Sequence, residues 1–272
     1  MDKAYQSSQC DGSRGAAALR EGCPRVWRFG QVESCLDTAR RLAERGWLSP
    51  WESVQAVVQT AGRGQLRRQW RSPAGNLYAV LRLPCASPFV GSAAGPAMGV
   101  LLVRALRGMG WPVELKWPND LVLADAAGNP RKLAGVLLEE RGGVLLAGVG
   151  LDVVWAPDAA ELRAGAALEA ICLAEAGVGG KGATKHIPTA EALWQQLVIC
   201  LYSAYNNDHS FLERWREGLD EVLLWRGLTV ELHDDGQVTR GRLEGLGASG
   251  GVLLDTGARV EEFFCGSLRR GG

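Results

Sequence analysis

Short apolar runs separated by polar turns predict strands in the first half of the chain. Residues 54–58 form one strand-like run, and residues 72–83 contain a second. Residues 144–153 are apolar throughout, which is typical of a strand in the middle of a sheet with both faces covered. Two further β-like runs flank a Trp-Pro-Asn-Asp turn within residues 114–140. The pattern therefore predicts a sheet of several strands.

Helical spacing appears between these runs and after them. Residues 37–45 place Ala39 and Leu42 on one face and charged side chains elsewhere, which predicts a short amphipathic helix. Residues 95–108 are dense in Ala, Val and Leu with little charge, so we expect a buried helix packed on the sheet. Residues 188–218 repeat apolar residues at helical spacing, which predicts one or two helices whose tryptophans belong to the core. The fold class predicted is α/β (α+β).

A change in composition near Leu224 predicts a domain boundary. From residue 227 onward, short β-like runs are broken by glycine-containing turns, which indicates a small barrel. Residues 1–25 are rich in Ser, Gly and Ala and predict a flexible segment. We therefore expect a flexible segment at residues 1–25, a main domain at residues 26–224 and a small β domain at residues 225–272.

The segment ELKWPNDLVLADAAGNPRKLAGVLLEE, residues 114–140, carries the densest candidate chemistry. Lys116 and Lys132 can each present a compact ammonium to a carboxylate or phosphate. Asn119 and Asp120 can cap backbone, orient a lysine or help to hold a metal. The alternative interpretation is an ordinary hairpin with two solvated lysines. The spacing favours an anion-handling site only if another anion-binding segment lies nearby.

The segment QTAGRGQLRRQW, residues 59–70, is a candidate for that second element. Two glycines flank Arg63, so the backbone can fold closely around a ligand while basic side chains neutralise phosphate or carboxylate charge. A flexible basic surface loop is the alternative. Because the segment joins two predicted core strands, we interpret it as a mobile lid over a nucleotide-like ligand.

Four blocks in this order resemble the biotin protein ligases. They are Ser34 in a strand-to-helix turn, QTAGRG with its basic tail, KWPNDL followed by KLAGVLLE, and GVGLD after Leu145. The resemblance runs from about residue 26 to the end, and it indicates the minimal kind without an N-terminal DNA-binding domain. It implies a class II synthetase-like mixed sheet with flanking helices and a small C-terminal SH3-like β-barrel.

The resemblance implies an ATP-dependent ligase that forms biotinyl-5'-AMP and transfers biotin to a lysine of a carrier protein. The implied partner is the biotin carboxyl carrier domain of acetyl-CoA or pyruvate carboxylase, and the implied substrates are biotin and ATP with Mg²⁺. No protein nucleophile is needed, because catalysis would consist of positioning and charge stabilisation. The family's self-association also leaves a homodimer open.

The resemblance assigns roles to residues of this sequence. The residues implied in biotin binding are Ser34, Cys35, Gln59, Gly62, Arg63, Gly64, Gln65, Lys132 and Gly135. Those implied in ATP binding are Arg63, Arg68, Trp70, Lys116, Asn119, Asp120, Lys132, Asp152 and Arg269, and those implied in catalysis are Lys132, Lys116 and Arg68. Asp120 is the residue implied in holding Mg²⁺.

Three departures from the family pattern keep other functions open. The turn that usually reads Asp-Ser-Thr-Asn contains Cys35 and Leu36 here, Gln65 replaces an arginine of the glycine-rich loop, and Asp152 stands where the family commonly has Asn. A lost buried hydrogen bond typically costs about 1 to 3 kcal/mol. The alternatives are a weakened relative that binds biotin or its adenylate, or a ligase for another short carboxylate such as lipoate.

Composition narrows the classes of partner. The 272 residues contain 30 Lys plus Arg and 30 Asp plus Glu, and this neutrality argues against a general nucleic-acid binder. Residues 1–25 cannot form a helix-turn-helix domain, so we expect no DNA binding, and the chain lacks a membrane-spanning run. Seven dispersed cysteines without CxxC spacing indicate reduced thiols and a cytoplasmic protein.

Overall fold

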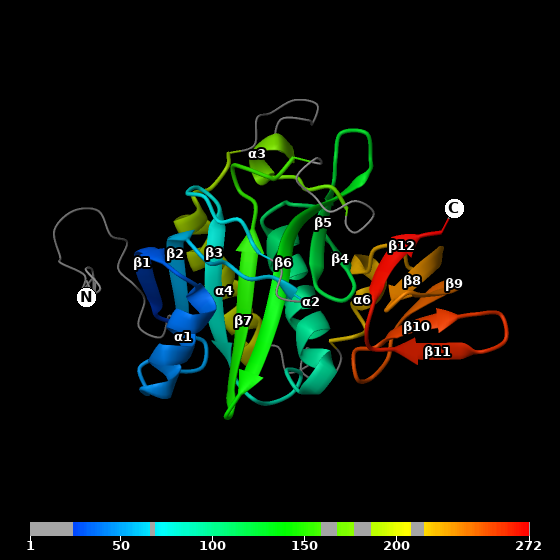
Figure 1. Ribbon diagram of the computed structural model, residues 1–272, viewed down its shortest axis with the longest axis horizontal. Coiled ribbons are helices and arrows are strands. Elements are labelled where there is room, and N and C mark those ends of the chain that lie inside the picture. Colours follow the sequence, from blue (N-terminus) through cyan, green and yellow to red (C-terminus); the bar gives the residue numbers. More distant parts are fainter. Residues whose placement is uncertain (1–23, 66–68, 159–167, 177–185, 208–214, 272) are drawn as a thin grey trace.

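A seven-stranded mixed sheet forms the centre of the molecule (Figure 1). The computed structural model describes residues 24–65, 69–158, 168–176, 186–207 and 215–271. The strands of this sheet are β1 (Val26–Val32), β2 (Ser53–Gln59), β3 (Leu77–Leu83), β4 (Glu114–Lys116), β5 (Asp120–Ala124), β6 (Pro130–Arg141) and β7 (Val144–Leu151). They lie in the order β1-β2-β3-β7-β6-β5-β4.

The pairing of the strands agrees with the sequence pattern. β1 and β2 are parallel, and the other neighbours in this sheet are antiparallel. β7 is the middle strand, as its continuous apolar run predicts. The run that carries Lys116 forms β4, which the Trp-Pro-Asn turn joins to its antiparallel neighbour β5, and Lys132 lies in the next strand, β6.

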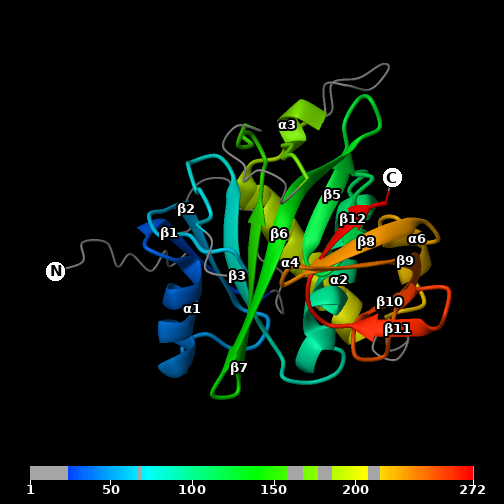
Figure 2. The same ribbon diagram turned by 45° about the vertical axis from the view of Figure 1, so that its right-hand side comes forward.

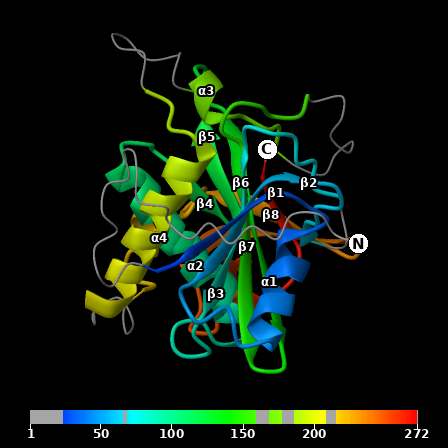
Figure 3. The same cartoon turned by 90° about the vertical axis from the view of Figure 1, so that its left-hand side faces the viewer.

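Helices cover both faces of the sheet (Figure 3). α1 (Cys35–Glu44) lies on one face, and α2 (Ala94–Gly108) and α4 (Ala190–Asn207) lie on the other. The short elements are η2 (Gly91–Ala93), α3 (Leu173–Ala176) and α6 (Leu219–Val222). All three predicted helical regions are confirmed, although residues 208–214 lie outside the described part. α1 begins two residues before its predicted start, because the extended backbone ends at Ser34.

The alternation of side chains in β3 explains why both faces need cover. Leu77, Ala79 and Leu81 point into the large core shared with α2 and α4. Tyr78 and Val80 point the other way, into a second core formed with α1. Burial of apolar side chains at roughly 25 cal/mol per Å² on both faces makes this strand a major contributor to stability.

A second, five-stranded antiparallel sheet follows the main sheet in sequence. Its strands are β8 (Thr229–Asp234), β9 (Gln237–Leu246), β10 (Val252–Asp255), β11 (Val260–Phe263) and β12 (Ser267–Arg270), in the order β11-β10-β9-β8-β12. The predicted small β domain is therefore present as a sheet, but its described strands do not close into a barrel. After β11 the chain crosses to pair β12 with β8, so the two edge strands do not meet.

The second sheet lies beside the β4 edge of the main sheet (Figure 1), and the turned view of Figure 2 brings it forward. The indole of Trp117, in the Trp-Pro-Asn turn, donates a hydrogen bond to the Gly250 carbonyl at 3.0 Å. Leu224 N donates to Leu115 O at 2.9 Å, and Ser92 Oγ donates to Ser249 O at 2.6 Å. The first and third bonds fix the β9–β10 turn against the Trp-Pro-Asn turn and η2, and the second joins the segment before β8 to β4.

We expect replacement of Gly250 by alanine to loosen this junction. Gly250 has φ +82°, and an added Cβ would lie 2.7 Å from Ala93 Cα, which is backbone that cannot move away cheaply. Gly257→Ala is the matched control, because its φ is +86° and nothing lies within 4 Å. Both variants carry the left-handed penalty of about 1 to 2 kcal/mol, and Gly250→Ala should lose about 1 to 3 kcal/mol more from overpacking. Urea unfolding measures the free energy of unfolding of both variants. Equal losses would contradict the close packing of Gly250 against Ala93.

Candidate functional site

The β4–β5 hairpin and β6 bring two lysines onto one carboxylate. Asp120 Oδ1 lies 2.6 Å from Lys132 Nζ, and Asp120 Oδ2 lies 3.5 Å from Lys116 Nζ. Lys116 is buried, whereas the Lys132 side chain is 24% exposed. The two lysines predicted to handle an anion therefore share one counter-ion, and Lys132 is the one that retains access to solvent.

Charge and burial compete in this cluster. Burial lowers the pKa of Lys116, Asp120 opposes that effect, and the positive charges of Lys132 and Arg269 lower the pKa further. Burial alone would raise the pKa of Asp120, but Lys132 and then Lys116 hold it below its usual range. The contribution of Arg269 shows that β12 of the second sheet brings its guanidinium charge close to Lys116. The cluster has more cations than anions, which suits a negatively charged ligand.

Asn119 has a different environment from its lysine neighbours. Its Nδ2 donates to the Val136 carbonyl at 2.8 Å, and Val136 N donates back to Asn119 O at 2.9 Å. These two bonds hold the Trp-Pro-Asn turn against β6. In the structure the Asn119 amide thus fixes the backbone that carries Lys116 and Asp120.

Two paired glycines form a floor beside Lys132. Gly135 of β6 is the partner of Gly150 in β7, and the Trp70 ring lies over both of them. A Cβ at Gly150 would lie 2.6 Å from Trp70 Cε2, so only glycine leaves room for the ring. Lys132 Nζ lies 5.4 Å from the centroid of that ring. The two glycines thus let the Trp70 ring pack against the sheet next to the cationic cluster.

The turn between β1 and α1 contains an unpartnered polar atom. Ser34 is buried, and its Oγ has no hydrogen-bond partner among the described residues. Gln59, at the end of β2, connects this turn to the segment that leads into β3. Its Oε1 accepts from Cys35 N at 2.9 Å, and its Nε2 donates to Ser72 Oγ at 3.0 Å. A buried hydroxyl without a partner is costly, so a polar ligand atom at this point would be favourable.

The side chain of Cys35 is inert in this setting. It is buried, and its Sγ contacts the Tyr78 carbonyl at 3.6 Å. Burial raises the pKa of the Cys35 thiol to about 12, so the group remains neutral. Leu36 packs close to Gly148 in β7. The two departures in this turn therefore fill space, while Ser34 keeps the polar function.

The glycine-rich loop is tied down at both ends. Arg63 pairs with Gln69 in a β-bridge, and its guanidinium lies 2.7 Å from Asp37 Oδ1 and 3.7 Å from Glu139 Oε1. Gly62 is buried, and an added Cβ would lie 2.5 Å from the Trp70 carbonyl. Gly64 and Gln65 follow, with Gln65 exposed. Arg68 lies outside the described residues.

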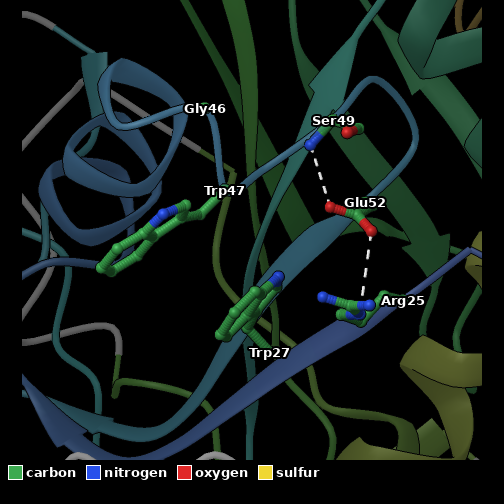
Figure 4. Close-up of a pocket in the computed structure, with 6 residues that line it drawn as sticks. All are labelled: Arg25, Trp27, Gly46, Trp47, Ser49 and Glu52. Carbon is green, nitrogen blue, oxygen red and sulfur yellow. Dashed lines mark hydrogen bonds and ion pairs between the residues drawn. The ribbon is translucent and has the colours of Figure 1, made fainter.

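Two hollows differ in their relation to these residues. A hollow of about 550 Å³ adjoins Gln59 and is also lined by Gln69, Arg71, Ser72, Pro73, Ala74 and Trp155. Another of about 490 Å³ lies at the β1 edge of the sheet and is lined by Arg25, Trp27, Gly46, Trp47, Ser49 and Glu52 (Figure 4). The second hollow contains none of the predicted site residues. Gln59 is the predicted site residue that lines the first hollow, whereas Trp70 and the two lysines line neither. We assign the candidate site to the region of Gln59, Trp70 and the two lysines on the basis of their contacts.

Sequence reasoning missed Asn76, which organises the end of β7. Its Oδ1 accepts backbone N–H bonds from Val153, Val154 and Trp155 at 2.9 to 3.1 Å. Its Nδ2 donates to Asp152 Oδ1 at 2.9 Å and to the Trp155 carbonyl at 2.7 Å. The only local signal was a single polar residue at the start of a strand.

Asp152 itself is 4% exposed, and burial raises its pKa to about 7 although Lys132 and the Asn76 hydrogen bond oppose the rise.

Comparison with known proteins identifies the family. A model of the Biotin/lipoate A/B protein ligase family matches residues 37–152. A protein from Paracoccus denitrificans named biotin--[acetyl-CoA-carboxylase] ligase is 31% identical over 221 residues, which cover 76% of this chain and 84% of that protein. The chain belongs to the biotin protein ligase family.

Other members of the family give a consistent picture. The bifunctional ligase/repressor BirA of Escherichia coli is 40% identical over 101 residues, which cover 36% of this chain and 30% of that protein. The structure of biotin protein ligase from Aquifex aeolicus in complex with biotin and ATP matches with a TM-score of 0.70 and 26% identity, covering 91% of this chain and 99% of that one. The family's fold therefore extends over nearly the whole chain.

Two further properties bear on the family's expected ligands. Among the described residues, no three His, Cys, Asp or Glu side chains gather closely enough to hold a metal ion. Both oxygens of Asp120 already face lysines, so the described residues do not provide a metal site of their own.

Of the described helices, none has the length and apolarity needed to cross a bilayer.

The raised pKa of Asp152 predicts a pH-dependent loss of stability. A carboxyl with a folded pKa of about 7 and an ordinary value near 4 stabilises the fold fully below about pH 4, and that contribution is lost as pH rises through about 7. Asp152→Asn removes this titration and keeps an acceptor for Asn76. Between about pH 5 and pH 8 the free energy of unfolding of the variant should gain about 2 to 3 kcal/mol relative to the unmodified protein. Urea unfolding across this range measures the difference, and parallel pH curves would show that Asp152 ionises normally.

Proposed function

We propose that this chain is an ATP-dependent biotin protein ligase that forms biotinyl-5'-AMP and transfers biotin to a lysine of a biotin carboxyl carrier domain. The observation that carries the proposal is the Lys116–Asp120–Lys132 cluster beside the glycine floor under Trp70. The name of the Paracoccus relative and the biotin and ATP bound to the Aquifex relative support it. The carrier would be a domain of acetyl-CoA or pyruvate carboxylase.

In the first step, an oxygen of the biotin carboxylate attacks the α-phosphorus of ATP, and the bond to pyrophosphate breaks. Both reactants are anions, so their approach needs fixed positive charge. Lys132 would turn from Asp120 towards the carboxylate and the α-phosphate, because its ammonium is the more exposed of the two. Lys116 and Arg269 would hold the remaining phosphates from the β4 edge.

Biotin's polar ring would occupy the turn between β1 and α1. The unpartnered Ser34 hydroxyl and the Gln59 amide supply the hydrogen bonds that a ureido group requires. The floor of Gly135 and Gly150 seats the Trp70 ring against the sheet, so that the ring would form one wall of the biotin site. Arg63, anchored to Asp37, holds the glycine-rich loop near the bound intermediate.

In the second step, the amine of the carrier lysine attacks the acyl carbon and AMP leaves. Water must be kept from the mixed anhydride until the carrier arrives. The described part of the glycine-rich loop, where Gly62 packs against Trp70 and Arg63 against Asp37, would help to exclude water. No side chain of the protein has to form a covalent intermediate.

Magnesium would enter as part of the MgATP complex. Mg²⁺ keeps several waters and binds through few carboxylates plus substrate phosphates. Asp120 would therefore contribute one oxygen only after Lys132 has turned to the substrate. We also infer that the five-stranded sheet is an SH3-like module in which β12 supplies Arg269 to the phosphates.

The direct test mixes the protein with biotin, ATP, Mg²⁺ and a purified carrier domain, and reads the carrier's mass and pyrophosphate release. We expect the carrier to gain one biotin. Lys132→Ala should slow pyrophosphate release by about 100-fold or more, because a preorganised cation at the reacting atoms is lost. Arg141→Ala, at the exposed end of the same strand, should leave the rate unchanged.

The same assay distinguishes the alternatives. Tight binding of biotin with no carrier product would point to a binding protein. Product with lipoate in place of biotin would point to another acid. Near-normal pyrophosphate release by Lys132→Ala would overturn the assignment of the site.

Gln65 is expected to affect retention of the adenylate. Because family members carry an arginine at this position, Gln65→Arg should add a charge-assisted hydrogen bond of about 1.5 to 3 kcal/mol to the intermediate. Release of biotinyl-5'-AMP after a single turnover should slow by about tenfold or more, whereas the rate of its formation should change little. Gln237→Arg, at an exposed position in β9 of the second sheet, is the control. Equal release from Gln65→Arg and the unmodified protein would contradict the role of this position.

A further inference from the structure

Four charged side chains form a chain of ion pairs on the α1 side of the main sheet. The Arg63 guanidinium of the glycine-rich loop lies 2.7 Å from Asp37 Oδ1 and 3.7 Å from Glu139 Oε1. The other carboxylate oxygen of Glu139, Oε2, accepts a hydrogen bond from Arg40 Nη2 at 3.2 Å. The two oxygens of Glu139 therefore face two different arginines, one from the loop and one from α1.

The spacing of these residues in their elements explains why they meet. Asp37 and Arg40 are three residues apart in α1, so they lie on the same side of the helix. Gly135, Leu137 and Glu139 alternate along β6 onto the face that α1 covers, since Leu137 packs against the core formed with α1. Glu139 therefore projects from the same face of the sheet as the glycine floor under the aromatic ring.

The two ends of this chain of ion pairs differ in their exposure to water. The Arg40 side chain is 13% exposed, whereas the side chains of Arg63 and Asp37 are 39% and 45% exposed. Salt screens an ion pair that water reaches more effectively than it screens a sheltered pair. Arg40 therefore fixes Glu139 to α1, and Arg63 is the partner that can separate from it.

Arg63 is linked to the candidate site through its neighbour Gly62. Trp70 N donates a hydrogen bond to the Gly62 carbonyl at 2.8 Å, and the Trp70 ring lies beside Lys132. An added Cβ at Gly62 would lie 3.1 Å from Gln59 Nε2, so the loop backbone packs closely on the amide proposed to bind biotin. A change in the position of Arg63 would therefore reach both the biotin contact and the aromatic wall.

The tether depends on one residue of the loop. Arg63 carries the only charge among residues 59–65 and 69–70, the part of this segment that the structure describes. Gln65 is neutral and exposed, although the family usually has an arginine there. The backbone of Arg63 also pairs with that of Gln69 in a β-bridge. The ion pairs of Arg63 thus act on both ends of the loop.

We propose that Glu139 is a positioning residue that, held by Arg40, keeps Arg63 and the glycine-rich loop at the site while the adenylate is bound. This inference rests on the proposed function, because it concerns the lifetime of biotinyl-5'-AMP on the protein. It goes further by assigning retention of the intermediate to a carboxylate that pairs with protein groups rather than with the ligand. It also makes that retention sensitive to salt. Asp37 supports the same tether from its exposed side.

Release of preformed biotinyl-5'-AMP tests the proposal. The protein is loaded with labelled biotin, ATP and Mg²⁺, and loss of the labelled adenylate is followed after dilution into unlabelled biotin and ATP. At low salt, Glu139→Gln should release the adenylate about fivefold faster than the unmodified protein, which is the effect expected from weakening a partly exposed ion pair. The rate of adenylate formation should change less than about twofold, because no group at the reacting atoms is altered.

Salt separates this tether from the other contacts of the adenylate. For the unmodified protein, release should quicken about fivefold between about 0.05 M and about 0.5 M salt, because the pairs of Arg63 become screened. In Glu139→Gln the increase should be about twofold or less. Glu140→Gln is the matched control, because this exposed neighbour projects from the other face of β6. It should keep both the rate and the salt dependence of the unmodified protein.

A double-mutant cycle shows whether Glu139 acts through Arg63. The tether is already lost in Arg63→Gln, so the further change Glu139→Gln should alter release less than about twofold in that background. If Glu139→Gln does not fold, Asp37→Asn provides the same comparison, because it removes the outer ion pair of Arg63. Asp37→Asn should also speed release and reduce its salt dependence.

The outcomes distinguish the inference from the function on which it rests. Equal release and equal salt dependence in Glu139→Gln and the unmodified protein would overturn the role of Glu139 and leave the ligase assignment intact. Effects of Glu139→Gln and Arg63→Gln that multiply would also overturn it, because Glu139 would then act independently of the loop. Faster and less salt-dependent release that is absent in the Arg63→Gln background would establish it. Failure of the unmodified protein to form any adenylate would instead overturn the proposed function.

Discussion

The shared carboxylate of Asp120 is the interaction on which the site depends. Two lysine ammonium groups brought together away from water would repel one another and lose hydration, and each penalty grows as the local dielectric falls. Asp120 offsets both, with 2.6 Å to Lys132 and 3.5 Å to Lys116. The unequal distances and exposures leave Lys116 as a fixed charge and Lys132 as the group free to exchange its partner for a substrate. A site of this kind is charged before substrate arrives, so little reorganisation is needed at the moment of reaction.

The sheet gives this cluster its surroundings through small residues at chosen positions. Leu145, Ala147 and Val149 of β7 fill the large core on the α2 side, whereas Gly148 and Gly150 leave the opposite face open. Leu36 closes one part of that face, and Trp70 lies over the other. The aromatic ring is thus held next to Lys132 by the absence of side chains beneath it. The same strand therefore fills the large core on one face and holds Leu36 and Trp70 on the other.

The sequence predicts local features of this fold better than distant ones. The β4–β5 hairpin and the middle strand β7 follow from turn residues and from an uninterrupted apolar run, which are properties of neighbouring residues. The role of Asn76 could not be found this way, because its partners lie 76 to 79 residues further along the chain. Closure of the second sheet depends likewise on which strand meets β12, and turn signals alone do not determine that pairing. The resemblance located the two lysines and Asp120, but it did not indicate that both lysines would share a single carboxylate.

The three departures from the family pattern act on different parts of the site. Cys35 and Leu36 are buried and apolar in effect, and Ser34 beside them keeps its hydroxyl unpartnered, so the turn retains one polar contact for a ligand. Gln65 is exposed in the loop, and we propose that it affects retention of an intermediate rather than its formation. Asp152 is the departure closest to the charges, because the field of Lys132 reaches it. Replacing a neutral amide by a carboxyl at this point costs stability at high pH, and Asn76 uses one of its two donor bonds to hold the carboxyl in place. The cost therefore falls on folding above neutral pH.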